Sequence, residues 1–422
     1  MRLTRTLATI GIVLTCSVGV PLSAPAGGID LYEMATPDVG LASAGYSARA
    51  QDASTLFKNP AGMSLLTGPQ AQVGAQVLYG DVEFSANQGK TQPFQGADNG
   101  GNAVGALPGG SFFITYPMTE KLTAGFGSFS YFGLAENYND NWIGRYYVQK
   151  GTLLGMSLMP AASFKVNDWL SIGGGLNAMY GYMNTEVAIR NPTPGDGQLK
   201  YKDEEWGFGG VGGILIQPCE GTRFGVTYVS PVKLNFSDKP GLSGVNTSIS
   251  SLPIFQNNLK IGITVPQSVM FGVWQKLNDQ WAIMADVGWQ NWSQFGDVDI
   301  GYDPSRPGLT AHLNYDDTWH GAIGAQYTAS EQWQFTGGFA YDTSAVSDAN
   351  RTVTLPMGEA YRFGLGALWK YSKSLDFNAA YEFMWCGDMP VDQPPSTYRG
   401  TVSGSYNNVW FSFFTLNLTW HF

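Results

Sequence analysis

Side chains that could perform catalysis are few in this chain. Its 422 residues include three histidines, His312, His320 and His421, and three cysteines. His320 follows Asp317 by three residues, a pair that a Ser-His-Asp hydrolase could use, but no serine motif accompanies it. The histidines and cysteines also lack the spacing of metal ligands. We therefore expect no enzymatic activity, no metal site and no cofactor.

The composition instead indicates strands that are apolar on one face only. Charged residues make up 13% of the chain, about half the ~25% that is usual in soluble domains, whereas 14% are aromatic and 54 are glycine. The mean hydropathy of -0.10 excludes a bundle of transmembrane helices, since each needs roughly 20 consecutive apolar residues. The net charge of -10 argues against a nucleic-acid partner, which would need clustered Lys and Arg. Together these values are typical of an outer-membrane β-barrel.

Alternation of apolar and polar residues supports this fold class. It recurs from residue 70 onward, as in Trp281 and Ile283 against Met284 and Asp286. A period of two is the strand signature, and aromatic residues near strand ends distinguish a membrane barrel from a soluble sandwich. We predict an all-β membrane protein with a barrel of fourteen antiparallel transmembrane strands. The strands are expected near residues 70–84, 109–117, 121–135, 151–166, 168–190, 204–217, 222–236, 259–276, 280–300, 316–329, 331–343, 358–371, 374–387 and 404–422.

The connections between the predicted strands alternate between short turns and long loops. Six short turns and seven long loops fit an even-stranded barrel whose short turns and termini face the periplasm. The last strand ends in Phe422, which shares its parity with Leu418 and Trp420. This ending resembles the signal read by the outer-membrane barrel assembly machinery. We therefore expect that machinery, outer-membrane lipid and lipopolysaccharide as partners, and a monomer in the cell outer membrane of a Gram-negative bacterium.

The N-terminus has the features of a secretory signal peptide, residues 1–26. Two arginines precede an apolar stretch, and Ala24-Pro25-Ala26 forms a cleavage site. The alternative, a lipoprotein signal at Cys16, lacks a small residue directly before the cysteine. The other cysteines, Cys219 and Cys386, fall at opposite ends of the predicted barrel. A disulfide needs Cα atoms within ~7 Å of each other, so we expect two free thiols.

Residues 27–69 do not alternate and carry the most specific motif. The run from Gly40 through Ala42-Ser43-Ala44-Gly45-Tyr46 to Asn59-Pro60-Ala61-Gly62-Met63 resembles the N-terminal hatch of the FadL family, outer-membrane transporters of long-chain fatty acids and other hydrophobic compounds. Further matches, such as Asn291-Trp292-Ser293 and Asp317-Thr318-Trp319, extend the resemblance over essentially the whole mature chain. The resemblance predicts three parts: the signal peptide (1–26), a helical hatch that plugs the lumen (27–69) and the transmembrane β-barrel (70–422).

The resemblance also implies a route for a ligand. In this family a hydrophobic ligand is caught among the outer loops, passes to an apolar pocket near the mature N-terminus, and leaves sideways through the barrel wall by passive, ligand-gated diffusion. The candidates for the pocket are Ile29, Leu31 and Met34. Those for the capture groove are Leu252, Ile254 and Phe255, in a loop that is apolar for an exposed segment. The alternative for Leu252, Ile254 and Phe255 is that they form a small core within their own loop and bind no ligand.

Two further sets of residues are candidates for the exit. Asn59, Pro60 and Ala61 are assigned to a hatch gate, because Pro60 favours a rigid turn that the resemblance places against a kinked third strand. A plain helix stop is the alternative. Gly125 and Gly127 are assigned to the strand kink, since glycine inside a strand often marks a bend. The chain is rich in glycine throughout, so the resemblance is the stronger argument here.

One departure from the family leaves the ligand open. Fatty-acid members use basic side chains in the lumen to meet the carboxylate, whereas this chain has Tyr315-Asp316-Asp317 where the tenth strand begins. Arg145, Arg190 and Arg362 are other candidate cations, but no motif fixes them. The expected function is transport of long-chain fatty acids or similar hydrophobic compounds. Aromatic hydrocarbons are alternative ligands, and a general diffusion porin is the alternative function.

Overall fold

The computed structural model describes residues 32, 34–91, 98–191, 195–302, 308–393, 395–396 and 399–422. The predicted signal peptide and the candidate pocket residues Ile29 and Leu31 lie outside these ranges, as does the side chain of Ile254. In the part of the chain that is described, no helix is long and apolar enough to span a bilayer.

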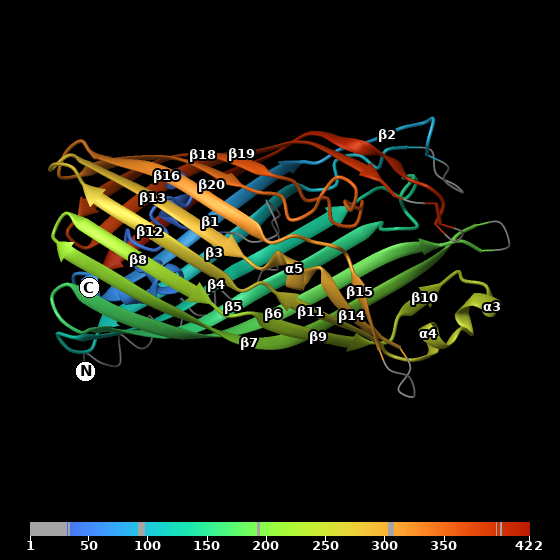
Figure 1. The fold of residues 1–422 in the computed structure, drawn as a ribbon, viewed down its shortest axis with the longest axis horizontal. Helices are drawn as coiled ribbons and strands as arrows, with labels where there is room; N and C mark the ends of the chain where they lie inside the picture. The colour runs from blue at the N-terminus through green and yellow to red at the C-terminus, as the bar shows by residue number, and fades with distance from the viewer. Residues whose placement is uncertain are drawn as a thin grey trace.

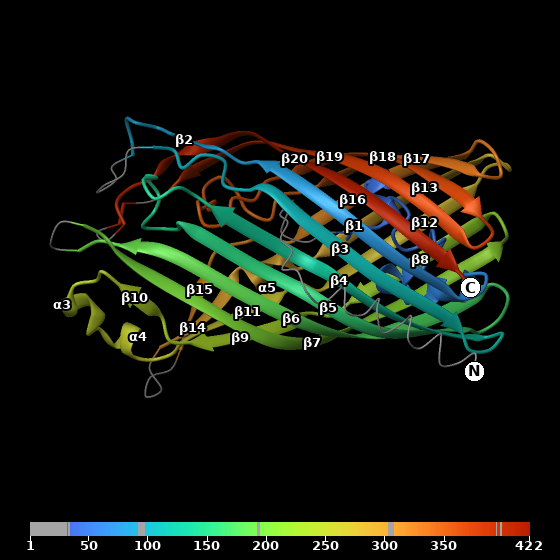
Figure 2. The ribbon, with the colours of Figure 1, turned by 180° about the vertical axis from the view of Figure 1, so that it is seen from behind.

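The described strands close into an antiparallel barrel (Figure 1). Fourteen of them pair in chain order, and the ring is closed by the pairing of β1 (Gln70–Asp81) with β20 (Ser403–His421), which Figure 2 shows side by side. Between them lie β3 (Gly105–Pro117), β4 (Leu122–Asn137), β5 (Lys150–Lys165), β6 (Leu170–Ile189), β7 (Gly197–Cys219), β8 (Thr222–Val229), β12 (Ser268–Lys276), β13 (Trp281–Gln290), β16 (Thr318–Thr328), β17 (Trp333–Asp342), β18 (Ala360–Ser372) and β19 (Leu375–Asp392). Two short strands extend the sheet: β2 (Phe84–Ala86) pairs with β20, and β10 (Gly241–Ser243) pairs with β7. The predicted fourteen-stranded barrel is confirmed.

Side chains on these strands alternate between the outer surface and the barrel interior. On β13, Ile283 and Val287 are exposed, whereas Met284 and Asp286 are buried. The exposed set is apolar, so it suits contact with lipid rather than water. The polar half of each strand therefore faces inward, where it can bind other parts of the chain.

The two ends of the barrel differ. Short turns join the strands at the end where the C-terminus lies, and longer connections gather at the opposite end (Figure 1). We call these the short-turn end and the long-loop end. Cys219 closes β7 at the short-turn end, and Cys386 lies in the second half of β19. Both are free thiols, as predicted.

A second sheet of four strands stands at the long-loop end. It contains β9 (Val232–Asp238), β11 (Leu259–Val265), β14 (Asp297–Gly301) and β15 (Leu309–His312), in the order β15-β14-β11-β9. The prediction of single strands over 222–236, 259–276 and 280–300 is therefore wrong. Pro231 and Pro266 interrupt the first two strands because proline cannot donate to a ladder, and the short helix α5 (Trp292–Phe295) interrupts the third. Beyond β10, α3 (Thr247–Ser250) and α4 (Pro253–Gln256) complete the outer loop.

The described residues 32 and 34–66, which we call the inner segment, lie inside the barrel. They contain only short helical turns: η1 (Pro37–Leu41), α2 (Thr55–Lys58) and η2 (Pro60–Leu65). η1 contacts β16 to β20, whereas η2 contacts β4 to β7, so the segment reaches both sides of the wall. In Figure 1 it is the blue coil enclosed by strands near the short-turn end. The hatch boundaries 27–69 remain a prediction.

Inward-facing glycines let the backbone of the inner segment touch the wall. A Cβ added at Gly74, Gly225 or Gly338 would collide with the carbonyl oxygen of Ala35, Ser47 or Leu41, respectively. These three wall positions belong to different strands, β1, β8 and β17. The close approach explains part of the high glycine content, because any larger side chain would hold the segment away from the wall.

Replacing Gly225 by leucine is expected to push the inner segment off β8. Overpacking of this kind costs about 1–3 kcal/mol because neighbouring groups must move. Arg49 and Lys58, which are buried, should then become accessible to trypsin, and mass spectrometry of the fragments would measure the cleavage. Gly321→Leu is the matched control, since a Cβ there meets nothing within 4 Å. Equal trypsin resistance of the Gly225 variant and the control would contradict the contact.

Candidate functional site

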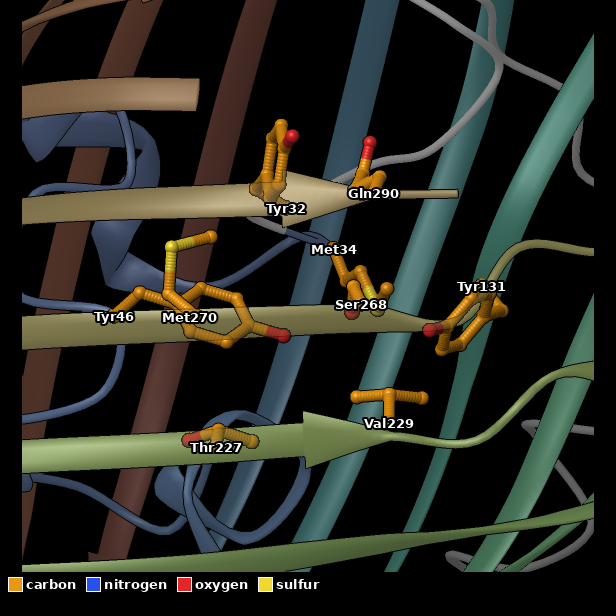
Figure 3. Close-up of a pocket in the computed structure, with 9 residues that line it drawn as sticks. All are labelled: Tyr32, Met34, Tyr46, Tyr131, Thr227, Val229, Ser268, Met270 and Gln290. Carbon is orange, nitrogen blue, oxygen red and sulfur yellow. The ribbon is translucent and has the colours of Figure 1, made fainter. Parts of the chain in front are cut away.

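A small pocket, with a cavity volume of about 20 Å³, lies between the inner segment and the barrel wall (Figure 3). Its lining comes from the inner segment and from β4, β8, β12 and β13. The residues are Tyr32, Met34, Tyr46, Tyr131, Thr227, Val229, Ser268, Met270 and Gln290. Figure 3 shows Tyr46 and Tyr131 pointing toward one another across the pocket. The pocket is thus assembled from five separate parts of the chain.

β4 is irregular at Tyr131, which lines the pocket. Ser130 pairs with Met156 and Phe132 with Gly155, so Tyr131 is an extra residue in the ladder with β5. Such a bulge bends a strand and redirects its side chains. Tyr131 keeps the inward parity of Gly127, and the bulge turns Phe132, the next residue, inward as well.

The hydrogen-bonded ladder between β3 and β4 stops next to this bulge. The ladder of these two strands ends at Ser111 and Phe129, although β3 begins at Gly105 and β4 continues to Asn137. Within the described residues, β4 beyond Phe129 forms a ladder with β5 alone, and only the Asn137 N–H at its end donates to the Ala103 carbonyl oxygen, just before β3. We call this unpaired stretch, 105–110 against 130–137, the wall seam. It borders the pocket through Tyr131.

Gly125 and Gly127, assigned from the sequence to a kink, lie earlier on β4. Both pair in regular register with β3 and β5. A Cβ at either position would meet Leu56 of the inner segment, so the two glycines make room for that side chain. Their role as a kink stays a prediction, and the irregularity seen in the ladder is at Tyr131.

The Asn59-Pro60-Ala61 turn packs against β6 and β7, not against β4 as expected. The Asn59 side-chain amide donates to the carbonyl oxygens of Ser47, at 2.7 Å, and Ile214, at 3.1 Å. Its Oδ1 accepts from the Ala61 N–H at 3.1 Å, which fixes the turn. The reason for the different contact is space, because Cβ atoms at Gly173 on β6 and Gly213 on β7 would collide with this turn. Contact with β4 is made by Leu56 and Met63 instead.

Polar contacts hold the inner segment to the wall and to itself. The buried Asp286 carboxylate accepts from the backbone N–H groups of Gly45, Tyr46 and Ser47, the last two at 3.2 and 3.3 Å. Inside the segment, the buried Asp38 pairs with both Arg49 and Lys58. A carboxylate that receives several donors in a buried site is a strong anchor, because removing it leaves those donors unsatisfied.

A buried charged cluster lies behind Tyr32. His320 Nδ1 lies 2.6 Å from Asp342 Oδ1, and Arg362 donates to Asp342 at 2.7 Å and to Glu382 at 3.2 Å. The Tyr32 ring lies 4.4 Å from the His320 ring, centroid to centroid, and 5.3 Å from the Arg362 guanidinium carbon. The cluster therefore positions one wall of the pocket.

The pairing of His320 with Asp317, considered from the sequence, does not form. Asp317 instead accepts from Ser293, Asn291 and Trp289 at the start of β16. Partial burial would raise the pKa of Asp317, but these hydrogen bonds outweigh it and lower the pKa. No group of three or more metal-ligating side chains occurs among the described residues.

The remaining sequence candidates fall in different places. Met34 lines the pocket. Leu252 and Phe255 lie near α3 and α4 at the long-loop end, where Leu252 is exposed, and the structure does not bring them to the pocket. Arg145 is paired with Asp196 at 2.9 Å in an outer loop. The ligand-binding roles of Met34, Leu252 and Phe255 remain predictions.

Comparisons with known proteins cover nearly the whole chain. The sequence model of the family described as outer membrane protein transport protein (OMPP1/FadL/TodX) matches residues 18–422. The long-chain fatty acid transport protein of Salmonella typhi is 24% identical over 428 residues, which cover 94% of this chain and 96% of that protein. Outer membrane protein P1 of Haemophilus influenzae is 26% identical over 407 residues, 86% of each chain.

Two solved structures share the fold. A FadL homologue from Pseudomonas aeruginosa superposes with a TM-score of 0.84 at 20% identity, covering 96% of this chain and 99% of that one. The Ralstonia pickettii toluene transporter TbuX gives a TM-score of 0.65 at 18% identity, covering 90% and 97%. At these identities the likeness supports the barrel architecture.

Proposed function

The chain belongs to the OMPP1/FadL/TodX family of outer membrane transport proteins, and from this premise we propose that it carries long-chain fatty acids or similar hydrophobic compounds passively across the outer membrane. Its place is the outer membrane, which agrees with a barrel that exposes apolar side chains outward. The inner segment is proposed to be the hatch that closes the lumen. Transport of this kind requires no reaction, and we propose no enzymatic activity.

The observation that supports this proposal best is the position of the pocket beside the wall seam. The pocket has one wall on the inner segment and another on Tyr131, where β4 parts from β3. A ligand leaving there would enter the membrane sideways, which suits a molecule that prefers lipid to water. We propose this lateral exit in place of a path through the short-turn end.

Aromatic hydrocarbons are the second candidate ligands. Three of the nine pocket residues are tyrosines, whose rings favour offset or edge contacts with another aromatic ring. The solved structure of TbuX is described as that of a toluene transporter. A general diffusion porin is a weaker alternative, because a porin needs a water-filled lumen and the inner segment contacts both sides of this one.

Uptake of labelled oleate and labelled toluene tests the proposal. The chain would be expressed in a host that lacks its own porter, and uptake compared with the same host carrying an empty vector. Faster uptake of either compound is the expected result. High conductance for hydrophilic ions in planar bilayers, without such uptake, would favour the porin instead.

Deleting Tyr131 tests the lateral exit. The deletion removes the extra residue, so β4 should pair with β5 in one continuous register and close toward β3. We expect uptake to fall about tenfold or more, the effect of a barrier raised by about 1.4 kcal/mol. Tyr131→Phe keeps the bulge and should retain most of the uptake. Wild-type uptake by the deletion variant would exclude an exit through this seam.

Contacts outside the site are also proposed. The outer surface contacts membrane lipid and lipopolysaccharide, the barrel acts as a monomer, and the barrel assembly machinery recognises the C-terminal Phe422. Phe422 is exposed, with its ring tilted by 39° at 4.8 Å, centroid to centroid, from that of Trp420, which leaves it available to a partner. Deletion of Phe422 should lower the amount of folded, heat-modifiable barrel in the outer membrane, as measured by gel electrophoresis. An unchanged amount would contradict this recognition.

A further inference from the structure

The described residues that line the pocket are all uncharged. Its polar lining consists of the phenols of Tyr32, Tyr46 and Tyr131, the hydroxyls of Thr227 and Ser268, and the amide of Gln290. The rest is apolar, from Met34, Val229 and Met270. None of these nine described residues is Lys, Arg, His, Asp or Glu. A ligand carboxylate would therefore find hydrogen-bonding groups but no counter-charge in the lining.

The buried cation that borders the pocket is already engaged. Arg362 donates to both Asp342 and Glu382, so two carboxylates share one guanidinium. Tyr32 lies over that guanidinium and itself lines the pocket. An anion in the pocket would thus compete with Asp342 and Glu382 for the Arg362 guanidinium, and Asp342 also lies 2.6 Å from His320 Nδ1.

Other interior cations are held elsewhere. Arg49 and Lys58 are paired with Asp38 inside the inner segment. Arg223 donates to the Arg49 carbonyl oxygen at 2.6 Å and stacks on Trp274. It lies four residues before Thr227 on β8, about 13 Å along the strand toward the short-turn end. None of these cations lines the pocket.

We propose that the pocket selects a ligand with an uncharged, hydrogen-bonding head. A neutral amphiphile such as an alcohol or a phenol, or the protonated form of a fatty acid, binds in preference to the carboxylate anion. The reason is desolvation, because a buried ion without a partner loses its hydration while a hydroxyl can exchange water for the lining groups. This inference rests on the proposed transport function and specifies the chemistry of the ligand head at the same site.

A matched pair of ligands tests the proposal. Binding of 1-dodecanol and of dodecanoate to the purified full chain in lipid nanodiscs would be measured at pH 8, where the carboxylate is ionised. We expect dodecanol to bind more than about tenfold tighter, a difference of ~1.4 kcal/mol. The two ligands have the same chain length, so apolar burial is nearly equal and the head group decides the difference.

Adding a cation to the lining should reverse the preference. Gln290→Lys and, separately, Ser268→Lys are expected to shift the ratio of affinities toward dodecanoate by about tenfold. The second variant is included because Gln290 also accepts a hydrogen bond from Trp292 Nε1, which Gln290→Lys removes. Gln290→Met is the uncharged control and should leave dodecanoate weak. Folding of each variant is checked by gel electrophoresis, in which a folded barrel migrates differently before and after heating.

The outcomes separate this inference from the proposed function. If wild-type protein binds dodecanoate as tightly as dodecanol, the head-group selection is wrong while transport stands. If both lysine variants fold and leave the ratio of the dodecanol and dodecanoate affinities unchanged, the ligand head group does not bind in this pocket. If neither ligand binds and neither oleate nor toluene is taken up, the transport function fails as well.

Discussion

Asp286→Ala is expected to release the inner segment and open the barrel to ions. The Asp286 carboxylate accepts three consecutive backbone N–H groups, from Gly45, Tyr46 and Ser47. Hydrogen bonds to a charged group contribute about 1.5–3 kcal/mol each, and their loss leaves buried donors unsatisfied. The docked state of the segment should therefore weaken by more than a factor of ten, which ~1.4 kcal/mol already produces.

Conductance in planar bilayers measures this release. Wild-type protein should conduct little, because the inner segment reaches both sides of the wall. Asp286→Ala should show openings of high conductance, and Asp286→Asn, which keeps one acceptor oxygen, should lie between the two. Asp376→Ala is the matched control, since it removes an interior carboxylate whose partner is His421, at 2.9 Å. Wild-type conductance from Asp286→Ala would show that other contacts suffice to hold the segment.

The barrel could be predicted from sequence because its rule is local. A side chain on a strand faces lipid or interior according to parity, so the alternation of Ile283 and Val287 with Met284 and Asp286 identifies the strand and its faces. Where the prediction was wrong, the cause was also local. Pro231 follows the end of β8, and Pro266 lies between β11 and β12. Each proline therefore divides one of the expected long strands into two.

The pocket could not be predicted in the same way. Parity makes Gln290 and Met270 interior residues but does not say which interior residues surround the inner segment. The register between β4 and β5 shifts by one residue at Tyr131, so that Phe132 is buried beside it, and no glycine or proline stands at Tyr131 to mark the shift. The Asn59-Pro60-Ala61 motif forms a turn in which Asn59 Oδ1 accepts from the Ala61 N–H, yet its contact with the wall depends on Gly173 and Gly213, more than a hundred residues away. These contacts are long-range in sequence and follow from packing, which local patterns do not encode.

Arg362→Met is expected to destabilise the barrel and to loosen the wall that Tyr32 forms. The Arg362 side chain is fully buried and bonded to Asp342 and Glu382, so its removal leaves two carboxylates close together without a guanidinium. Removing one partner of a buried ion pair costs about 3–5 kcal/mol, far more than the pair itself contributes to stability. The free energy of unfolding, from guanidinium titration of protein in lipid vesicles, should fall by that amount.

A double and a triple variant show whether uncompensated charge or lost packing causes the loss of stability in Arg362→Met. Arg362→Met combined with Glu382→Gln, and then also with Asp342→Asn, removes the uncompensated charges one by one while it keeps the side-chain volumes. If charge is the cause, each step should recover stability, and the coupling energies will be far from additive. Lys276→Met is the control, because it breaks an exposed pair with Asp279 and should leave the unfolding midpoint unchanged. No recovery in the triple variant would assign the loss to packing around the guanidinium and to its contact with Tyr32.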